Sequence, residues 1–190
     1  ELTKSRKKFS ILSEEIGEVK NSDKENYWII DPIDGTTNFL HGIPHFAISI
    51  ALKTKEEIVS GLIFDPIKNE MFYAEKNNGA YFNNQRIRVS KKKNLDECLF
   101  ATGSKSENIN SLNIRKTGCA ALDMAYVGAG RYDGCFQKNL NIWDIAAGII
   151  IIKEAGGKIN DIDYSSSEVI KVLAGSNSIY EKMLENLNNF

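Results

Sequence analysis

Cysteine and histidine are scarce in this chain of 190 residues, which holds three cysteines and two histidines. Cys98, Cys119 and Cys135 are odd in number and widely spaced in apolar surroundings, so we expect buried thiols rather than a disulfide framework. No pair has the CxxC spacing, and His41 and His45 add too few ligands to favour a zinc site. The sequence therefore argues against both a disulfide scaffold and a structural zinc protein.

A charge excess of either sign is also lacking, because 24 Lys and Arg stand against 25 Asp and Glu, a formal net charge of −1. This balance argues against an electrostatic nucleic-acid binder, which usually carries a strong basic excess. The longest apolar run, Ile145–Ile152, is far shorter than the roughly 18 residues that a membrane span needs. Residues 1–8 show no secretory pattern. We therefore expect a cytoplasmic protein with neither nucleic-acid nor membrane partners.

A hydrophobic fraction of 42% is enough for a packed core in one domain, or at most two small ones. The first half of the chain has strand composition in short runs that polar turns separate. Asn83-Asn84 favours a tight hairpin, because asparagine tolerates positive φ. We predict an antiparallel meander with strands at Tyr27–Ile30, Phe46–Leu52, Glu57–Phe64, Glu70–Ala74, Ala80–Phe82 and Arg86–Ser90.

In the second half the hydrophobic period becomes helical. The expected elements are a strand at Leu99–Ala101, helices at Gly118–Gly130 and Trp143–Ala155, strands at Lys158–Ile162 and Ile170–Ala174, and a helix at Ser178–Leu187. This order predicts α+β or layered α/β architecture, with a β-rich half at residues 1–103 and an α/β half at residues 114–190. The polar stretch 103–113 is the most linker-like segment.

The most informative stretch is Trp28–Phe39, WIIDPIDGTTNF, in which Asp31 and Asp34 flank a proline and precede a glycine. Because proline fixes φ and glycine permits unusual backbone, both carboxylates are expected on one side of a tight turn. An ordinary type I turn explains the pattern about equally well. In the alternative, Mg²⁺ takes oxygens from Asp31, the Ile33 carbonyl and Asp34. Gly35-Thr36-Thr37 then offers exposed amides for a phosphate.

Further acids lie far away along the chain, at Glu14-Glu15 and at Asp144 in the first turn of a predicted helix. Taken alone, the first is typical of a solvated face and the second of a helix cap. Together with Asp31 and Asp34 they describe an acidic cluster that needs cations, although spacing alone does not show that they meet.

Trp28–Phe39, taken with WDIAAG at Trp143–Gly148 about 110 residues later, resembles the two signature motifs of the inositol monophosphatase family of Mg²⁺-dependent, lithium-sensitive phosphatases. The likeness continues through His41–Ala51, Gly61–Ala80 and Ile114–Arg131, and it is greatest to the bacterial inositol-1-monophosphatase-like branch. The resemblance implies one domain over residues 1–190, built as αβαβα layers but without the family's N-terminal helical pair.

The resemblance also implies roles for single residues. The implied metal ligands are Glu14, Asp31, Ile33 through its carbonyl, Asp34 and Asp144. The implied catalytic residues are Glu14, Thr36 and Asp31, with Thr36 matching the hydroxyl that orients the attacking water. The implied substrate-binding residues are Ile33, Asp34, Gly35, Thr36, Gly118, Cys119, Ala120, Gln137 and Asp144. Gln137 stands where animal inositol phosphatases have a Glu that contacts inositol hydroxyls.

The implied mechanism is hydrolysis by metal-activated water, with two or three Mg²⁺ ions and no covalent intermediate. One ion lowers the pKa of a water positioned by Glu14 and Thr36, and a second, held by Asp34 and Asp144, neutralises the leaving alkoxide. Five acids are then expected to converge on one pocket: Glu14, Glu15, Asp31, Asp34 and Asp144. The implied partners are a small phosphate ester and a second copy in a homodimer.

The leading hypothesis is therefore a phosphomonoesterase acting on inositol-1-phosphate or a similar small sugar or polyol phosphate. Fructose-1,6-bisphosphate and a 3′-phosphorylated nucleotide are alternatives within the same chemistry, because Gln137 lacks the charge of the family's hydroxyl acceptor. A non-catalytic regulatory or interaction protein that keeps the fold is the alternative from another class.

Overall fold

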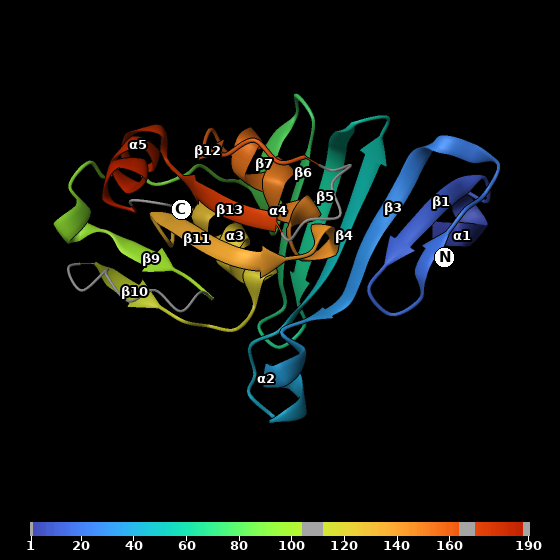
Figure 1. The fold of residues 1–190 in the computed structure, drawn as a ribbon, viewed down its shortest axis with the longest axis horizontal. Helices are drawn as coiled ribbons and strands as arrows, with labels where there is room; N and C mark the ends of the chain where they lie inside the picture. The colour runs from blue at the N-terminus through green and yellow to red at the C-terminus, as the bar shows by residue number, and fades with distance from the viewer. Residues whose placement is uncertain (1, 104–111, 164–169, 188–190) are drawn as a thin grey trace.

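The computed structural model describes residues 2–103, 112–163 and 170–187, which form two mixed β-sheets (Figure 1). The first sheet has the strand order β2-β1-β3-β4-β5-β6-β7-β8 and the second β10-β9-β11-β13-β12. The first sheet consists of β1 (Phe9–Ser13), β2 (Gly17–Val19), β3 (Asp23–Asp34), β4 (Ala47–Thr54), β5 (Glu57–Asp65), β6 (Glu70–Glu75), β7 (Gly79–Phe82) and β8 (Gln85–Arg86). The second consists of β9 (Leu99–Ala101), β10 (Asn113–Arg115), β11 (Gly134–Leu140), β12 (Lys158–Ile159) and β13 (Ile170–Gly175).

The helices cover these sheets in layers. They are α1 (Leu2–Ser5), α2 (Thr36–Leu40), α3 (Ala120–Gly128), α4 (Ile142–Glu154) and α5 (Asn177–Asn186), with a 3-10 turn at Leu95–Glu97. Helices α3 and α4 share one core with the first sheet and another with the second, so they form the layer between the sheets. Helix α5 packs on the opposite face of the second sheet through Ile179, Tyr180 and Met183. The predicted layered α/β class is therefore confirmed.

Helix α4 shows why the chain needs a nearly continuous apolar run. Its residues Ala147, Ile150 and Ile151 join the core against the first sheet, whereas Ile145 and Ile149 join the core against the second. A helix buried on both sides must be apolar around its circumference. Where α4 crosses β5, a Cβ on Gly61 would lie 2.6 Å from Ile150 and 2.8 Å from Ala147. This glycine therefore allows the close approach of helix and sheet.

The predicted meander is confirmed, because β3 to β8 pair antiparallel in sequence order. Its last turn has the predicted positive φ, 44° at Asn83 and 67° at Asn84. The predicted strand Arg86–Ser90 is wrong after Arg86, because the Val89 N–H turns away from the sheet and donates to Ala155 O at 3.2 Å.

The predicted strand Lys158–Ile162 is likewise shorter, since it ends at Ile159 as β12. At the next residue, Asn160, the N–H still donates to Leu173 O at 3.1 Å, but the Leu173 N–H donates to the side-chain Oδ1 of Asn160 at 2.7 Å instead of to a backbone carbonyl. The predicted helices differ from α3, α4 and α5 by at most two residues at any end.

Several elements were not predicted. Strand β1 pairs parallel with β3, and β11 lies at the centre of the second sheet between β9 and β13. Burial of the first four residues of β11 leaves no alternation of polar and apolar side chains to mark it as a strand. Most of the linker-like stretch, residues 104–111, lies outside the described residues.

All three cysteines are free and buried, as predicted. Among the described residues, no helix has the length and apolar character of a membrane span.

Candidate metal and phosphate site

Asp31 and Asp34 point to the same side of β3 because the strand bulges between them. Asp31 pairs with Ser49 of β4 and Asp34 pairs with Ala47, so three steps along β3 oppose two along β4. Residues three apart in a regular strand face opposite sides, and one extra residue brings them back to the same side. Pro32, which has no N–H to give to the ladder, lies in this bulge.

The predicted strand Tyr27–Ile30 therefore continues through Asp34, and the motif is a bulge within a strand rather than the tight turn after its end. Inside the bulge, Asp31 Oδ1 accepts from the Ile33 N–H at 2.9 Å, which fixes the carboxylate against the backbone. Asp31 is almost fully buried at 1% exposure.

Asp34 is held by the start of α3. Its Oδ2 accepts from the Ala121 N–H at 2.6 Å and from Cys119 Sγ at 2.9 Å. The amino end of a helix favours a carboxylate there, because its first N–H groups lack partners within the helix. This contact joins β3 to a helix more than eighty residues later in the chain.

Asp144 lies in the first turn of α4. Its Oδ2 accepts from the Asn141 N–H at 2.8 Å, which completes a capping box with Asn141. The helix-cap interpretation of this residue is thus correct, and it coexists with membership of the acidic cluster. Its location follows from α4 packing against β3 and β4 in the core between the sheets.

The carboxylates of Asp31, Asp34 and Asp144 each offer an oxygen within 4.8 Å of the others. In the described part of the chain, none of these three forms an ion pair with a lysine or arginine. Burial, followed by the charges of Asp34 and Glu14, raises the pKa of Asp31 to about 8. Burial also raises the pKa of Asp34, and it raises the pKa of Asp144 to about 6. Full ionisation of the three carboxyl groups is therefore unfavourable without a cation, and a bound cation would relieve this cost.

Glu14 lies at the rim of this cluster. It is exposed, it follows β1, and its carboxylate is close enough to Asp31 for a side-chain hydrogen bond that raises the pKa of Asp31. Its N–H donates to Ile30 O at 3.2 Å, so the pairing of β1 with β3 places it beside the cluster. The neighbouring Glu15 is also exposed but does not line the pocket, which departs from the expectation that five acids converge.

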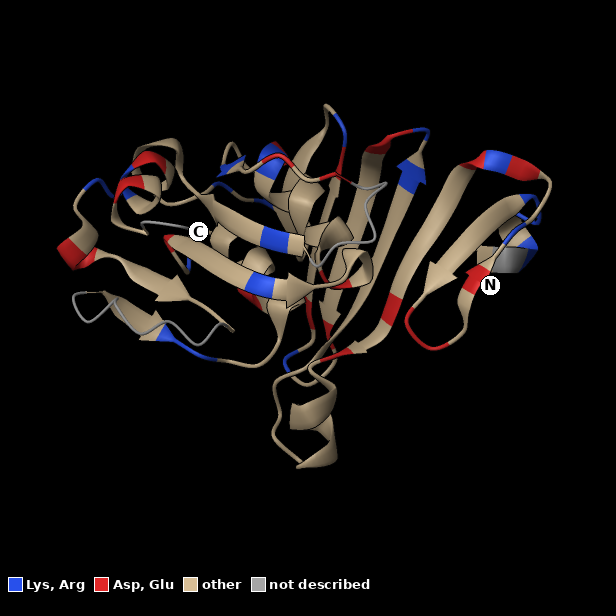
Figure 2. Cartoon of the chain, viewed as in Figure 1, with Lys and Arg blue, Asp and Glu red and all other residues tan. Residues whose placement is uncertain are grey.

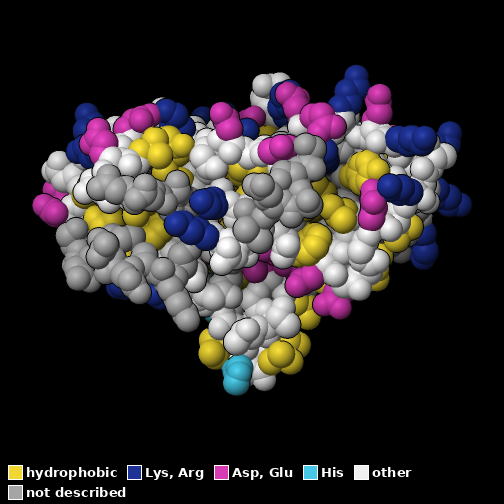
Figure 3. Space-filling model, in the orientation of Figure 1, with side chains coloured by type: hydrophobic (Ala, Val, Ile, Leu, Met, Phe, Trp, Pro, Cys, Tyr) yellow, Lys and Arg dark blue, Asp and Glu magenta, His cyan; other side chains and the backbone are white. Residues whose placement is uncertain are grey.

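All of the residues to which the resemblance gives a catalytic, metal-binding or substrate-binding role line one open hollow of about 180 Å³. Its lining consists of Glu14, Asp31, Ile33, Asp34, Gly35, Thr36, Gly118, Cys119, Ala120, Gln137, Leu140 and Asp144. Only Leu140, at the end of β11, was not named from the sequence, and an isolated leucine gives no signal of its own. Figure 2 shows acidic segments at the lower ends of the strands of the first sheet, above the projecting α2, and Figure 3 shows acidic side chains near the centre of the same face.

Gly35 is required at the edge of this hollow. Its φ is +89°, and a Cβ there would meet His45 O at 3.2 Å and Cys119 Cβ and Gly118 O at 3.3 Å. Thr36 follows at the start of α2, and its Oγ1 donates to Ile33 O at 3.0 Å. Asn38, two residues further, is buried and donates through Nδ2 to both His45 O and Thr117 O at 2.8 Å. These contacts tie the start of α2 to the segment before α3.

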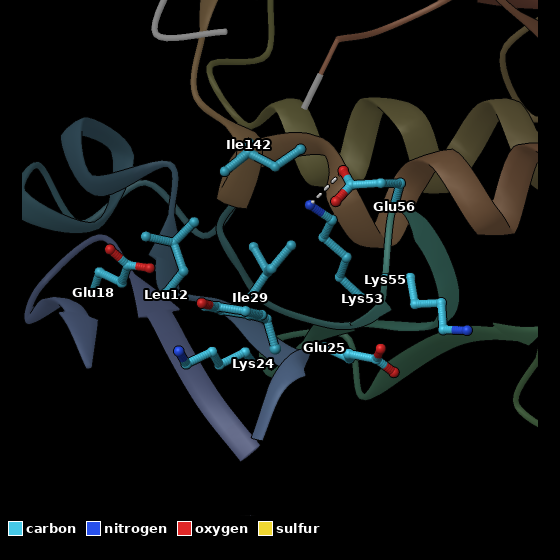
Figure 4. A pocket seen from close by; sticks show the side chains of 10 residues that line it. Leu12, Glu18, Lys24, Glu25, Ile29, Lys53, Lys55, Glu56 and Ile142 are labelled. Atoms are coloured by element: carbon cyan, nitrogen blue, oxygen red, sulfur yellow. Dashed lines mark hydrogen bonds and ion pairs between the residues drawn. The ribbon is translucent and has the colours of Figure 1, made fainter. Parts of the chain in front are cut away.

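A second hollow, of about 480 Å³, lies between strands β1 to β4 and the start of α4 (Figure 4). Its lining mixes both signs of charge with the apolar Leu12, Ile29 and Ile142. One ion pair, Lys53 to Glu56 at 3.1 Å, crosses part of it. None of the residues predicted for catalysis, metal or substrate lines this hollow.

Comparison with known proteins agrees with this geometry. The family model described as the inositol monophosphatase family matches residues 1–189. An inositol-1-monophosphatase of Caulobacter vibrioides is 42% identical over 98% of this chain and 80% of its own length, and the Nus factor SuhB of Escherichia coli K12 is 38% identical over 99% and 77%. The crystal structure of the extragenic suppressor protein suhB from Bartonella henselae has a TM-score of 0.93 and 43% identity, over 99% of this chain and 79% of that one. The chain belongs to the inositol monophosphatase family, whose name denotes phosphoric monoester hydrolases.

Proposed function

We propose that this protein is a Mg²⁺-dependent phosphomonoesterase that hydrolyses inositol-1-phosphate or a similar small polyol phosphate. The observation that carries the proposal is the cluster of Asp31, Asp34 and Asp144, three carboxylates within 4.8 Å that lack a cationic partner among the described residues. Such a cluster is costly in a folded protein unless cations bind to it. Inositol-1-phosphate is the first candidate substrate, because the Caulobacter vibrioides relative is named inositol-1-monophosphatase.

The donor set fits magnesium, because every candidate ligand is a hard oxygen. Asp31, Asp34, Asp144 and Glu14 would hold the metal through carboxylates, and Ile33 through its carbonyl. Bound divalent ions supply a water of lowered pKa and neutralise charge on the leaving oxygen. The chain's own contribution is to hold the ligands rigidly: the bulge fixes Asp31, the start of α3 fixes Asp34 and the capping box fixes Asp144.

Thr36 and Glu14 are proposed to position the attacking water. Because Thr36 Oγ1 already donates its proton to Ile33 O, the hydroxyl oxygen is left to act as an acceptor for a water proton. Glu14 is exposed at the rim, where its carboxylate can accept a second proton from the same water. The backbone of Gly35-Thr36 is proposed to bind the phosphate, and the wall formed by Gly118, Cys119, Ala120 and Gln137 to contact the polyol.

A release assay tests the proposal. Purified protein is incubated with inositol-1-phosphate, fructose-1,6-bisphosphate or a 3′-phosphorylated adenosine nucleotide, with Mg²⁺ and with or without Li⁺, and inorganic phosphate is measured. We expect Mg²⁺-dependent release, inhibited by Li⁺ and fastest with inositol-1-phosphate. Preference for the bisphosphate or the nucleotide would move the substrate to one of the two alternatives.

The relatives named Nus factor SuhB favour a second candidate, a regulatory or interaction protein that keeps the fold. Failure to release phosphate from any of the three esters, by a folded preparation that binds Mg²⁺, would favour that role over catalysis.

Homodimer formation and a cytoplasmic location complete the proposal. Apolar side chains on and after the projecting α2 support association, since Phe39 is 47% exposed, Leu40 75% and Ile43 48%. A monomer mass in solution would contradict the dimer.

A further inference from the structure

Asp123 is a buried carboxylate that the mechanism does not use. It lies on α3 and is 1% exposed. Its Oδ1 accepts from Thr117 Oγ1 at 2.7 Å, and its Oδ2 accepts from Gln137 Nε2 at 2.8 Å. Both partners are neutral, and no lysine or arginine of the described residues forms an ion pair with it. A buried carboxylate without a cation is expensive, so its retention calls for a specific reason.

Both partners of Asp123 belong to the walls of the polyol side of the hollow. Gln137, on β11, lines the hollow directly. Thr117 precedes the lining residues Gly118–Ala120, and its carbonyl accepts from Asn38 at 2.8 Å. Asp123 therefore joins two walls that come from different elements, and each hydrogen bond ends on a residue at or next to the hollow.

The carboxylate also decides which way the Gln137 amide faces. An ionised carboxylate accepts hydrogen bonds but donates none, so the amide must turn its Nε2 toward Asp123 and its Oε1 away. A Cβ on Gly103 would lie 3.0 Å from this Oε1, so the absence of a side chain at Gly103 leaves room beside it. Within the described residues, Oε1 accepts no hydrogen bond, and it is not among the buried atoms without a partner. Gln137 lines the hollow, and its Oε1 is thus a neutral acceptor that the contact with Asp123 leaves unused.

We propose that Asp123 is a positioning residue that fixes the Gln137 amide so that Oε1 accepts a hydrogen bond from a substrate hydroxyl. This inference rests on the proposed function and narrows its substrate class to phosphate esters of neutral polyols with a free hydroxyl near the phosphate. The oriented amide dipole of Gln137, rather than a charged side chain, then accepts the hydrogen bond from the substrate hydroxyl.

The test compares two esters and a cycle of variants. Asp123→Asn, Gln137→Glu and the double variant are assayed with inositol-1-phosphate and with 4-nitrophenyl phosphate, which carries no aliphatic hydroxyl. The readout is the ratio of kcat/KM for the first ester to that for the second. Asp65→Asn, which removes another buried carboxylate outside the hollow, is the matched control. Assays run at about pH 8.5, above the pKa of Asp123, which burial raises to about 7.

Asp123→Asn lets the glutamine amide turn over, and Gln137→Glu sets two carboxylates against each other at the 2.8 Å contact. Each single variant is expected to lower the ratio about tenfold, the scale of one misdirected hydrogen bond. In the double variant, the new asparagine Nδ2 donates to the new carboxylate while its Oδ1 still accepts from Thr117. The ratio is therefore expected to recover to within about threefold of the unaltered protein, a rescue that general destabilisation does not produce.

The proposal is overturned if Asp123→Asn leaves the ratio unchanged, if Asp65→Asn lowers it equally, or if the double variant is as impaired as the product of the two single variants. If the unaltered protein hydrolyses neither ester, the proposed function fails separately. Urea unfolding of the unaltered protein, the two single variants and the double variant then decides the pairing of Asp123 with Gln137: recovery of the unfolding midpoint in the double variant supports it, and additive losses overturn it.

Discussion

Asp31 and Asp34 face the same hollow although they lie three positions apart on β3, because one extra residue bulges from the strand between them. Because of this bulge, the two aspartates of the DPxDG motif direct their carboxylates into the same hollow. Asp144 then joins them from α4 because that helix is buried between the two sheets. The candidate metal site thus depends on the bulge in β3 and on the packing of α4 against both sheets.

Asp34→Asn is expected to abolish Mg²⁺-dependent phosphate release while leaving the fold intact. Its amide oxygen can still accept from the Ala121 N–H, but the charge that attracts the cation is gone. Steady-state phosphate release and the far-ultraviolet circular dichroism spectrum check the two halves of this prediction. Near-normal turnover by a folded Asp34→Asn protein would rule out the assignment of this residue.

Cys119→Ala is expected to raise the Mg²⁺ concentration for half-maximal activity by about tenfold, because Asp34 Oδ2 loses the thiol that orients it. Cys119→Ser keeps a donor at the same place and serves as the matched control, with a change of less than about threefold. Magnesium titration of the initial rate measures both. If both variants need the same Mg²⁺ concentration for half-maximal activity, the hydrogen bond from Cys119 to Asp34 does not determine the Mg²⁺ requirement.

Gly35→Ala is expected to destabilise the protein by about 2 kcal/mol or more, because it combines a positive φ with contacts of 3.2 to 3.3 Å to its new Cβ. Gly42→Ala provides the control, since Gly42 has a φ of +68° but nothing within 4 Å. That variant is expected to cost about 1 kcal/mol through backbone strain alone. Urea unfolding gives both values, and equal losses would contradict a steric role for the tight edge of the hollow.

The metal-free protein is expected to lose stability as pH rises from about 4 to about 8. Asp31 has its pKa raised to about 8 and Asp144 to about 6, so over this range the folded state holds protons that the unfolded state has released. Stability from these groups is therefore greatest below pH 4 and declines through the folded-state pKa values. Thermal unfolding in a chelator across this range measures the slope. Saturating Mg²⁺ should flatten it, and a metal-free protein whose cluster stabilises it at high pH would contradict this account.

Part of the fold follows from local signals in the sequence. The paired asparagines mark the β7–β8 hairpin, and the isoleucine run marks a helix that is buried on both sides. The parallel pairing of β1 with β3 and the place of β11 could not be predicted, because long-range packing decides them and neither leaves a periodic pattern.

The residues of the hollow, apart from Leu140, were predicted from their motifs and from the family resemblance. The bulge that turns Asp31 and Asp34 to the same side was not predicted. A bulge is visible only when the registers of β3 and β4 are compared. The same holds for Asp123: its place on a predicted helix is compatible with support of a substrate loop or with a dimer contact, and only the structure shows its hydrogen bond with Gln137 of β11.

The most direct test of the central claim is the rate of phosphate release from inositol-1-phosphate as Mg²⁺ is titrated, for the unaltered protein and for Asp144→Asn. The account predicts a saturable, Mg²⁺-dependent rate that Li⁺ inhibits and that Asp144→Asn removes without unfolding the protein. A rate that does not depend on Mg²⁺, or one that the Asp144→Asn variant retains, would contradict it.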